Sequence, residues 1–202
     1  MRTDPETPVD LERLSAAWED RRERCRPVGH LLSETYREQW VRFHYLPGSK
    51  RYPESEREYR VLLRRQHTLL ADLRAPAELL VITCAWHEED RPGPAERSPA
   101  LAAVAPGTYW RAVVEDEHID PAQQVPVHLY AGRLANTPQA LDPLLRAVAD
   151  EVTIGVILAP DSLDWLVHPY DGGIDIIAGS EAERDALRLR HAGWLSSHPE
   201  GY

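Results

Sequence analysis

Residues 165–178 read WLVHPYDGGIDIIA, a pattern that predicts a β-hairpin. Asp171-Gly172 suits a two-residue turn of the primed type, so residues that face each other have numbers that sum to 343. This register places six apolar residues on one face, whereas a shift by one residue would scatter them over both faces. These residues are Trp165, Val167, Pro169, Ile174, Ile176 and Ala178. The hairpin therefore predicts antiparallel pairing in the C-terminal part of the chain.

The same register puts His168 directly opposite Asp175, on the other face of the hairpin. Aspartate is depleted in strands, so Asp175 between two isoleucines calls for a reason. A carboxylate beside an imidazole favours the imidazolium and orients the ring, as a general base requires. The pair is a candidate catalytic pair for proton transfer. The alternative is a cross-strand polar pair at a sheet edge or on a solvated face, which the lack of an accompanying nucleophile favours.

Hydrophobic patterns elsewhere predict the rest of an α+β domain. Alternating or continuous apolar runs indicate strands at 40–46, 79–86, 108–114, 125–134 and 152–158. Helical spacing indicates helices at 10–24, 53–74 and 138–149, and Ser180 with Glu183 matches a capping box that opens a last helix. We find no internal repeat and no dividing linker. Residues 1–202 are therefore expected to form a single domain, a mainly antiparallel sheet flanked by helices, in which the helix within residues 1–26 can be peripheral.

The loop between Pro47 and Pro53 is a candidate anion-binding site. Gly48 and Ser49 allow backbone N–H groups to converge on an anion, while Lys50 and Arg51 add positive charge just before a helix. Lys50 is the only lysine among the 23 basic residues. The loop is not a P-loop, because the glycine expected four residues ahead of a Gly-Lys pair is missing. The alternative interpretation is that the loop is a structural turn that starts the next helix.

The sequence predicts neither a metal site nor a cofactor site. It has nine histidines, but none lies in a predicted helix at the His-x-x-x-His or Glu-x-x-His spacing that places ligands on one helix face. Cys25 and Cys84 alone cannot make a disulfide framework or a four-ligand zinc site. The common dinucleotide, esterase, thiol-redox and zinc-protease motifs do not occur in the sequence.

The charge of the chain limits its partners. The formal net charge is −10, which disfavours binding to nucleic acid or to anionic membranes. No apolar run approaches the length of a membrane span, and the polar N-terminus does not look like a signal peptide, so we expect a cytoplasmic protein. Residues 76–202 carry most of the negative charge. Glu115, Asp116 and Glu117 in an acidic loop, together with Trp194, are the candidate contacts for a basic protein partner.

Four arginines lie close together at the end of the first predicted helix, at positions 21, 22, 24 and 26. They could be read as an anion-binding patch. However, neighbouring acids such as Asp20 and Glu23 form helical pairs with them at a spacing of three or four residues. The pattern therefore favours a solvated helix face.

Two boxes in the sequence resemble a known family. The first is the box LPGSKRYP at residues 46–53, followed by a helix rich in Glu and Arg. The second is the hairpin HPYDGGIDII at 168–177, followed by a helix that ends near Trp194. Together they resemble a family of small uncharacterised bacterial proteins, common in actinobacteria, that carry a domain of unknown function. The resemblance implies a bacterial intracellular setting and no catalytic residues. Some small α+β families of this kind serve as immunity proteins or antitoxins, which is an analogy of fold.

Two functions follow as hypotheses. The first is a non-enzymatic protein-binding module of the inhibitor or immunity type. The second is a small enzyme acting on an anion or nucleotide, in which Lys50 and Arg51 hold phosphate while His168 and Asp175 transfer a proton. The enzyme requires the two boxes to lie side by side, because catalytic groups must reach one substrate.

Overall fold

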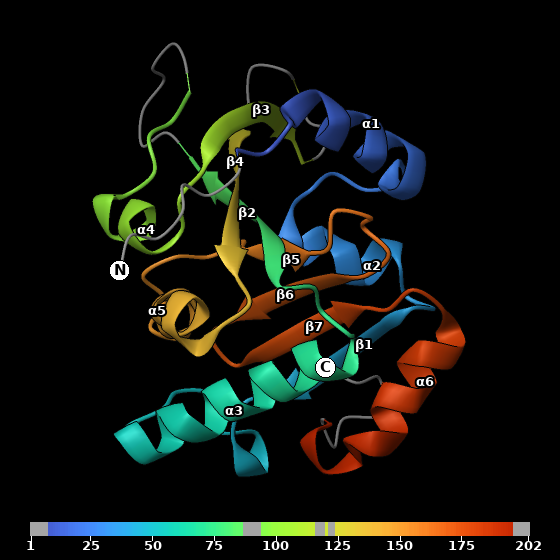
Figure 1. Cartoon of the computed structure of the whole chain (residues 1–202), viewed down its shortest axis with the longest axis vertical. Coiled ribbons are helices and arrows are strands. Elements are labelled where there is room, and N and C mark those ends of the chain that lie inside the picture. The colour runs from blue at the N-terminus through green and yellow to red at the C-terminus, as the bar shows by residue number, and fades with distance from the viewer. Residues whose placement is uncertain (1–7, 87–93, 116–119, 121–123, 196–202) are drawn as a thin grey trace.

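A computed structural model describes residues 8–86, 94–115, 120 and 124–195. Within these residues, seven strands form one sheet in the order β1-β7-β6-β5-β2-β4-β3, and every neighbouring pair is antiparallel (Figure 1). The strands are β1 Trp40–His44, β2 Glu78–Ala85, β3 Thr108–Val114, β4 Pro126–Ala135, β5 Ile157–Ala159, β6 Leu166–Tyr170 and β7 Gly173–Ile177. The expected α+β class with an antiparallel sheet is confirmed.

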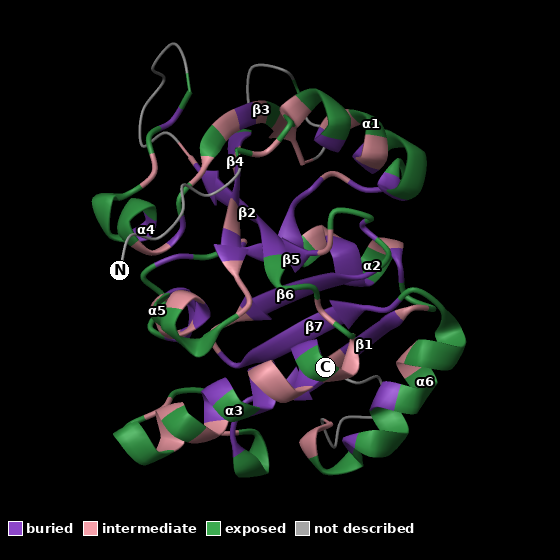
Figure 2. Ribbon diagram, in the orientation of Figure 1, coloured by how far each residue is buried: buried purple, intermediate pink, exposed green. Residues whose placement is uncertain are grey.

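Helices cover both faces of this sheet. They are α1 Leu11–Arg22, α2 Leu32–Thr35, α3 Glu56–Asp72, α4 Pro99–Val104, α5 Pro138–Ala149 and α6 Glu181–Arg190. Short 3-10 turns occur at Gly29–Leu31, Pro47–Ser49 and Ala192–Trp194. Most strands and the inner sides of the helices are buried, whereas the edge strand β3 and the outer helix faces are largely intermediate or exposed (Figure 2). The fold is thus a three-layer arrangement of helices, sheet and helices.

Side chains that alternate along the strands contribute to two separate hydrophobic cores, one on each face of the sheet. On β2, Leu79 and Val81 join the core formed with α3, α4, α5 and α6, whereas Leu80 and Ile82 join the core formed with α1 and α2. Successive side chains of a strand point to opposite faces, so one apolar strand serves both cores. A central strand buried on both faces reads as a continuous apolar run, as β2 does.

The C-terminal hairpin has the predicted register. Leu166 pairs with Ile177 and His168 with Asp175, so opposite residues do sum to 343. The following helix α6 begins as expected, because Ser180 Oγ accepts the backbone N–H of Glu183 at 3.2 Å. The Glu183 carboxylate in turn accepts the N–H of Gly179 at 3.1 Å, one residue earlier than the usual capping box.

Three expectations about the elements need correction. The helix expected from 53 begins at Glu56, because Ser55 caps it, accepting the N–H of Glu58. The strand expected at 152–158 is limited to Ile157–Ala159. Glu151 and Gly155 have φ of 55° and 71°, which interrupts an extended chain. The short helix α4 begins at the end of the loop that the sequence predicts at 88–100 and extends beyond it.

The N-terminal helix α1 is an integral part of the second core. Asp10 caps it by accepting the N–H of Arg13 at 3.0 Å. Its Leu14 and Trp18 are buried, and the Trp18 ring meets that of Trp110 from β3 edge to face at 6.2 Å. The packing of α1 on the sheet therefore does not fit a peripheral position.

Gly132 provides a test of how closely the chain packs on β4. A Cβ atom there would lie 1.8 Å from the carbonyl oxygen of Pro106, which is backbone and cannot rotate away. We expect Gly132→Ala to lower the free energy of unfolding by at least about 2 kcal/mol through overpacking, measured by urea denaturation. Gly193→Ala, where an added Cβ meets nothing within 4 Å, is the control and should change stability little. Equal stability of the two variants would contradict the packing described here.

Candidate functional site

His168 and Asp175 lie opposite each other, but each is bonded to another group. Asp175 accepts two hydrogen bonds from Arg42 of β1, from Nε at 2.7 Å and from Nη2 at 2.8 Å. The His168 Nδ1 atom lies 2.8 Å from the carbonyl oxygen of Val156. Gly29 packs flat against the ring, since a Cβ there would be 2.3 Å from Nδ1. The pair expected from sequence is thus part of a buried row, Arg42–Asp175–His168, that crosses three strands.

Burial decides the charge of this histidine. It lowers the pKa of His168 and outweighs the opposing effects of the Val156 carbonyl and the Asp175 carboxylate. The imidazole is therefore neutral at pH 7, where the sequence argument favoured the imidazolium. A role of His168 and Asp175 in proton transfer stays a prediction.

The loop at 47–53 carries its charges paired with carboxylates. Lys50 Nζ lies 2.8 Å from Glu58 and 2.9 Å from Glu54, and the hydrogen bond with Glu58 is the main reason that the pKa of Lys50 is raised. Arg51 Nε donates to the carboxylate of Asp171 in the hairpin turn. Gly48 and Ser49 have φ of 66° and 57°, a left-handed turn that launches the chain toward α3. An anion at this loop would have to compete with these carboxylates.

The two boxes nevertheless meet in the fold. The Arg51–Asp171 ion pair joins them, and the backbone N–H of Tyr45 donates to the carbonyl of Gly172 at 3.4 Å. The enzyme hypothesis required this proximity. The structure brings together Arg51 and the hairpin turn, while Lys50 points to α3.

The candidate partner contacts are only partly described. The Glu115 carboxylate lies 3.1 Å from His30 Nε2, and Asp116 and Glu117 lie outside the described residues. Trp194 stacks on His191 at 4.2 Å, and the Arg65 guanidinium lies 4.9 Å from its ring. Trp194 is therefore half-buried and mainly fastens the end of α6.

The described part of the chain contains two free cysteines and no cluster of metal-ligating side chains. No group of three or more His, Cys, Asp or Glu side chains there could hold a metal ion. Cys25 and Cys84 are free and buried, and burial raises the pKa of the Cys84 thiol to about 12. Among the same residues, no helix is both long and apolar enough to cross a membrane.

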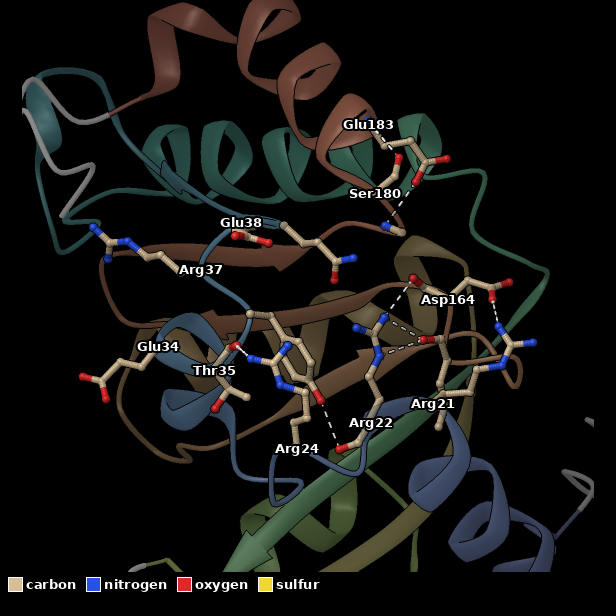
Figure 3. A pocket seen from close by; sticks show the side chains of 14 residues that line it. Arg21, Arg22, Arg24, Glu34, Thr35, Arg37, Glu38, Asp164, Ser180 and Glu183 are labelled. Atoms are coloured by element: carbon tan, nitrogen blue, oxygen red, sulfur yellow. Dashed lines mark hydrogen bonds and ion pairs between the residues drawn. The ribbon is translucent and has the colours of Figure 1, made fainter.

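A polar cleft of about 890 Å³ offers a further candidate site. Four segments line it: the end of α1, the chain from α2 into β1, the turn before β6, and the start of α6. Figure 3 shows that side chains of Arg22, Asp164 and Ser180 approach the same space from separate elements. The volume lies in the upper part of the range for ligand sites.

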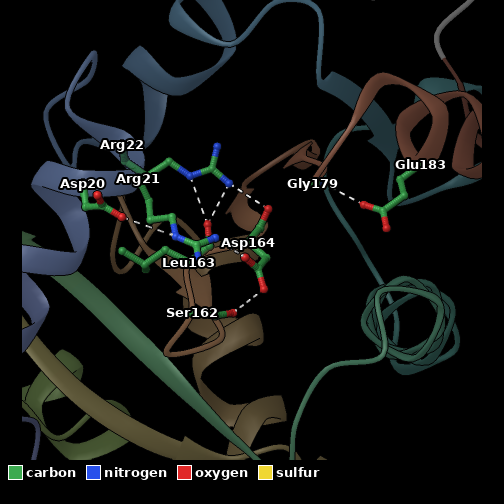
Figure 4. Close-up of polar contacts among 8 residues, drawn as sticks. All are labelled: Asp20, Arg21, Arg22, Ser162, Leu163, Asp164, Gly179 and Glu183. Atoms are coloured by element: carbon green, nitrogen blue, oxygen red, sulfur yellow. Dashed lines mark hydrogen bonds and ion pairs between the residues drawn. The ribbon is translucent and has the colours of Figure 1, made fainter.

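Arg22 is the central group of this cleft. It is only 6% exposed, and its Nε and Nη2 donate to the carbonyl of Leu163 at 3.1 and 2.8 Å (Figure 4). Nη2 also donates to the carbonyl of Asp164 at 2.8 Å. Leu163 has a φ of 53°, an uncommon conformation for a residue with a side chain, and it presents its carbonyl to the guanidinium.

Tyr36 and Arg21 line the same side of the cleft as Arg22. Burial raises the pKa of Tyr36 to about 12, so its hydroxyl stays protonated and donates to the backbone carbonyl of Arg22 at 3.0 Å. Arg21 forms a partly exposed ion pair with Asp164 at 2.7 Å. The prediction that these arginines form a solvated face is wrong for Arg22. The sequence does contain a signal for the burial of Arg22: it lies four residues after Trp18 and eight after Leu14, on the apolar stripe of α1.

The family of this protein follows from its sequence. Residues 28–199 match a family model described as Domain of unknown function (DUF3885). The chain belongs to this family. No curated protein and no solved structure matches it. The DUF3885 match begins after α1, so Arg21, Arg22 and Arg24 of the cleft come from outside the matched region.

The two neighbouring arginines allow a matched test of the bonds between α1 and the DUF3885 region. Arg22→Met removes the donors to the Leu163 and Asp164 carbonyls, and we expect a loss of at least about 2 kcal/mol in the free energy of unfolding. Arg21→Met removes a pair that is 54% exposed on the arginine side and should cost less than about 1 kcal/mol. Urea denaturation measures both. A smaller loss of stability for Arg22→Met than for Arg21→Met would contradict the conclusion that the bonds of Arg22 hold α1 on the DUF3885 region.

His168 predicts a pH dependence of stability for the DUF3885 domain. Its folded pKa lies below the ordinary 6.5, so between these values the unfolded chain binds a proton that the folded chain does not. Stability should therefore fall as the pH falls from 7 to 5. We expect His168→Gln to reduce this slope, whatever its stability at pH 8. Parallel pH profiles of wild type and variant, from urea denaturation at each pH, would show that another group causes the change.

Proposed function

We propose that the protein is a non-enzymatic binding module and that a segment of a partner protein occupies the polar cleft. The observation that carries this proposal is the lining of the cleft. Four arginines and four carboxylates surround it, brought together from four segments of the chain. A lining with both signs of charge suits a ligand that itself carries both, as a peptide segment does.

The carboxylates at the rim distinguish a peptide from a simple anion. Glu34 and Glu38 are exposed and line the cleft. Neither has a hydrogen bond or ion pair within the described part of the chain. Beside these two groups a simple anion would be repelled, whereas a peptide can place a basic side chain there and an acidic group elsewhere in the cleft. An inhibitor or immunity-type role is one form that such binding can take.

The enzyme alternative has less geometric support. Lys50 and Arg51 are already paired with Glu58 and Asp171, and His168 is buried and neutral. A general base must reach its substrate and change its protonation state near the working pH.

The free thiols of Cys25 and Cys84 suit a reducing compartment, so we propose that the binding takes place in the cytoplasm.

Long-range charge supports a partner with a basic surface. Eight of the 33 acidic residues but only two of the 23 basic residues lie outside the described part of the chain. Much of the net negative charge therefore belongs to those segments, including Asp116 and Glu117. Such charge speeds the encounter with a basic protein, while the cleft selects the segment that is bound.

Selection from a displayed library of random dodecapeptides tests the proposal. We expect the full-length protein to enrich peptides that carry both acidic and basic residues. The double variant Glu34→Lys/Glu38→Lys should weaken their binding at least about tenfold, which corresponds to the loss of one good charged contact.

The control is Glu12→Lys/Glu78→Lys, which makes the same change of charge at two exposed positions that do not line the cleft. It should leave binding unchanged if the cleft is the site. Failure to enrich any peptide, or an equal effect of both double variants, would reject the cleft as the binding site for a peptide.

A further inference from the structure

Arg22 has binding capacity left over inside the cleft. Its Nε and Nη2 are bonded to backbone carbonyls, but no described group accepts from Nη1. In Figure 4 this nitrogen carries no dashed line and points away from Leu163 and Asp164. A terminal guanidinium nitrogen has two N–H donors. Arg22 can therefore donate to a ligand without giving up any contact that holds the fold.

The charge of Arg22 has no direct counter-ion. The carboxylate of Asp164 is bonded to Arg21 at 2.7 Å and to the Ser162 hydroxyl at 2.7 Å, so its negative charge acts on Arg22 only through space and does not offset the effect of burial on the Arg22 pKa. The groups that Arg22 does contact are neutral carbonyls. Burial lowers the pKa of Arg22, which shows that its surroundings disfavour the positive charge. A buried cation without an ion-pair partner is costly, and an anionic ligand would offset that cost.

Arg24 adds a second cation to the same place. The Cζ atoms of Arg22 and Arg24 lie 5.1 and 6.0 Å from the centre of the Tyr36 ring. The described contacts of Arg24 are this ring and a long hydrogen bond of 3.4 Å to the carbonyl of Thr35. Two guanidinium groups thus share one aromatic ring, and no described carboxylate pairs with either.

The start of α6, at the other side of the cleft, does not supply the anion. Ser180 and Glu183 bond to the backbone N–H groups of Glu183 and Gly179 there, so the helix end is capped by the chain itself. The Glu183 carboxylate is occupied at Gly179. The positive charge of Arg22 and Arg24 is therefore not compensated from the α6 side of the cleft.

We propose that Arg22 Nη1 and Arg24 form an oxyanion subsite of the cleft, which binds a carboxylate or a phosphate group. This rests on the cleft of the proposed function and names its anchor. Guanidinium groups bind both oxyanions through charged hydrogen bonds and prefer them to other anions for their geometry. In a partner segment, the group would be an acidic side chain, a C-terminal carboxylate or a bound phosphate.

NMR titration of the full-length protein with inorganic phosphate and, separately, with acetate tests the subsite. The Nε–Hε signals of Arg22 and Arg24 report on the site directly. We expect these signals to shift with a saturating dependence on at least one of the two probes, and the affinity to fall as NaCl is raised. A response to phosphate alone would assign the anchor to phosphate, and a response to acetate alone would assign it to a carboxylate; either supports the subsite.

Arg24→Gln is the decisive variant, because Arg24 is exposed and its loss does not remove the bonds of Arg22 that hold the fold. It should weaken oxyanion binding at least about tenfold. Arg57→Gln, at an exposed position of α3 outside the cleft, is the matched control and should bind as the wild type does. No shift of the two arginine signals with either probe, or equal affinities of Arg24→Gln and wild type, would overturn the subsite. Peptide binding that depends on Glu34 and Glu38 could still succeed in that case, so the two proposals can fail separately.

Discussion

The buried residue Arg22 joins three parts of the chain. It belongs to α1, it bonds to the carbonyls of Leu163 and Asp164 before β6, and its own backbone carbonyl accepts from Tyr36 after α2. These bonds tie α1 to the turn before β6 and to the end of α2, and one of the carbonyls belongs to Leu163, which has a left-handed conformation. The segments that these bonds connect also line the polar cleft.

The sheet explains why polar groups of the two boxes are buried. Both faces of β6 and β7 are covered, so every residue of β7 is buried, including Asp175. A buried carboxylate needs a partner, and Arg42 on the neighbouring edge strand provides a two-point ion pair. Burial keeps His168 neutral, although the Val156 carbonyl that it contacts favours the charged form. The row is well explained as a structural element of the sheet.

Sequence reasoning was most successful where the information was local. The register of the hairpin followed from one two-residue turn and the alternation on each side of it. The bounds of α5 and β3 followed from a proline at the first helical position and from a run of strand-forming residues. It was wrong at 152–158, where apolar Val152 and Ile154 are about half exposed, because two left-handed residues bend the chain away from the sheet.

The sequence by itself determined the class of the fold, the pairing of His168 with Asp175 across the hairpin, and membership of the DUF3885 family. Only the tertiary structure decided which charges are compensated. The sequence suggested that Lys50 and Arg51 could bind an anion, but both are paired with carboxylates. It suggested that Arg22 is solvated, but Arg22 is buried and bonded to backbone carbonyls. The reason is physical: helix and strand patterns act over a few residues, but the counter-ion of a charged group can come from any segment. Asp171 and Leu163 lie 120 and 141 residues from Arg51 and Arg22 in the sequence and meet them only in the folded chain.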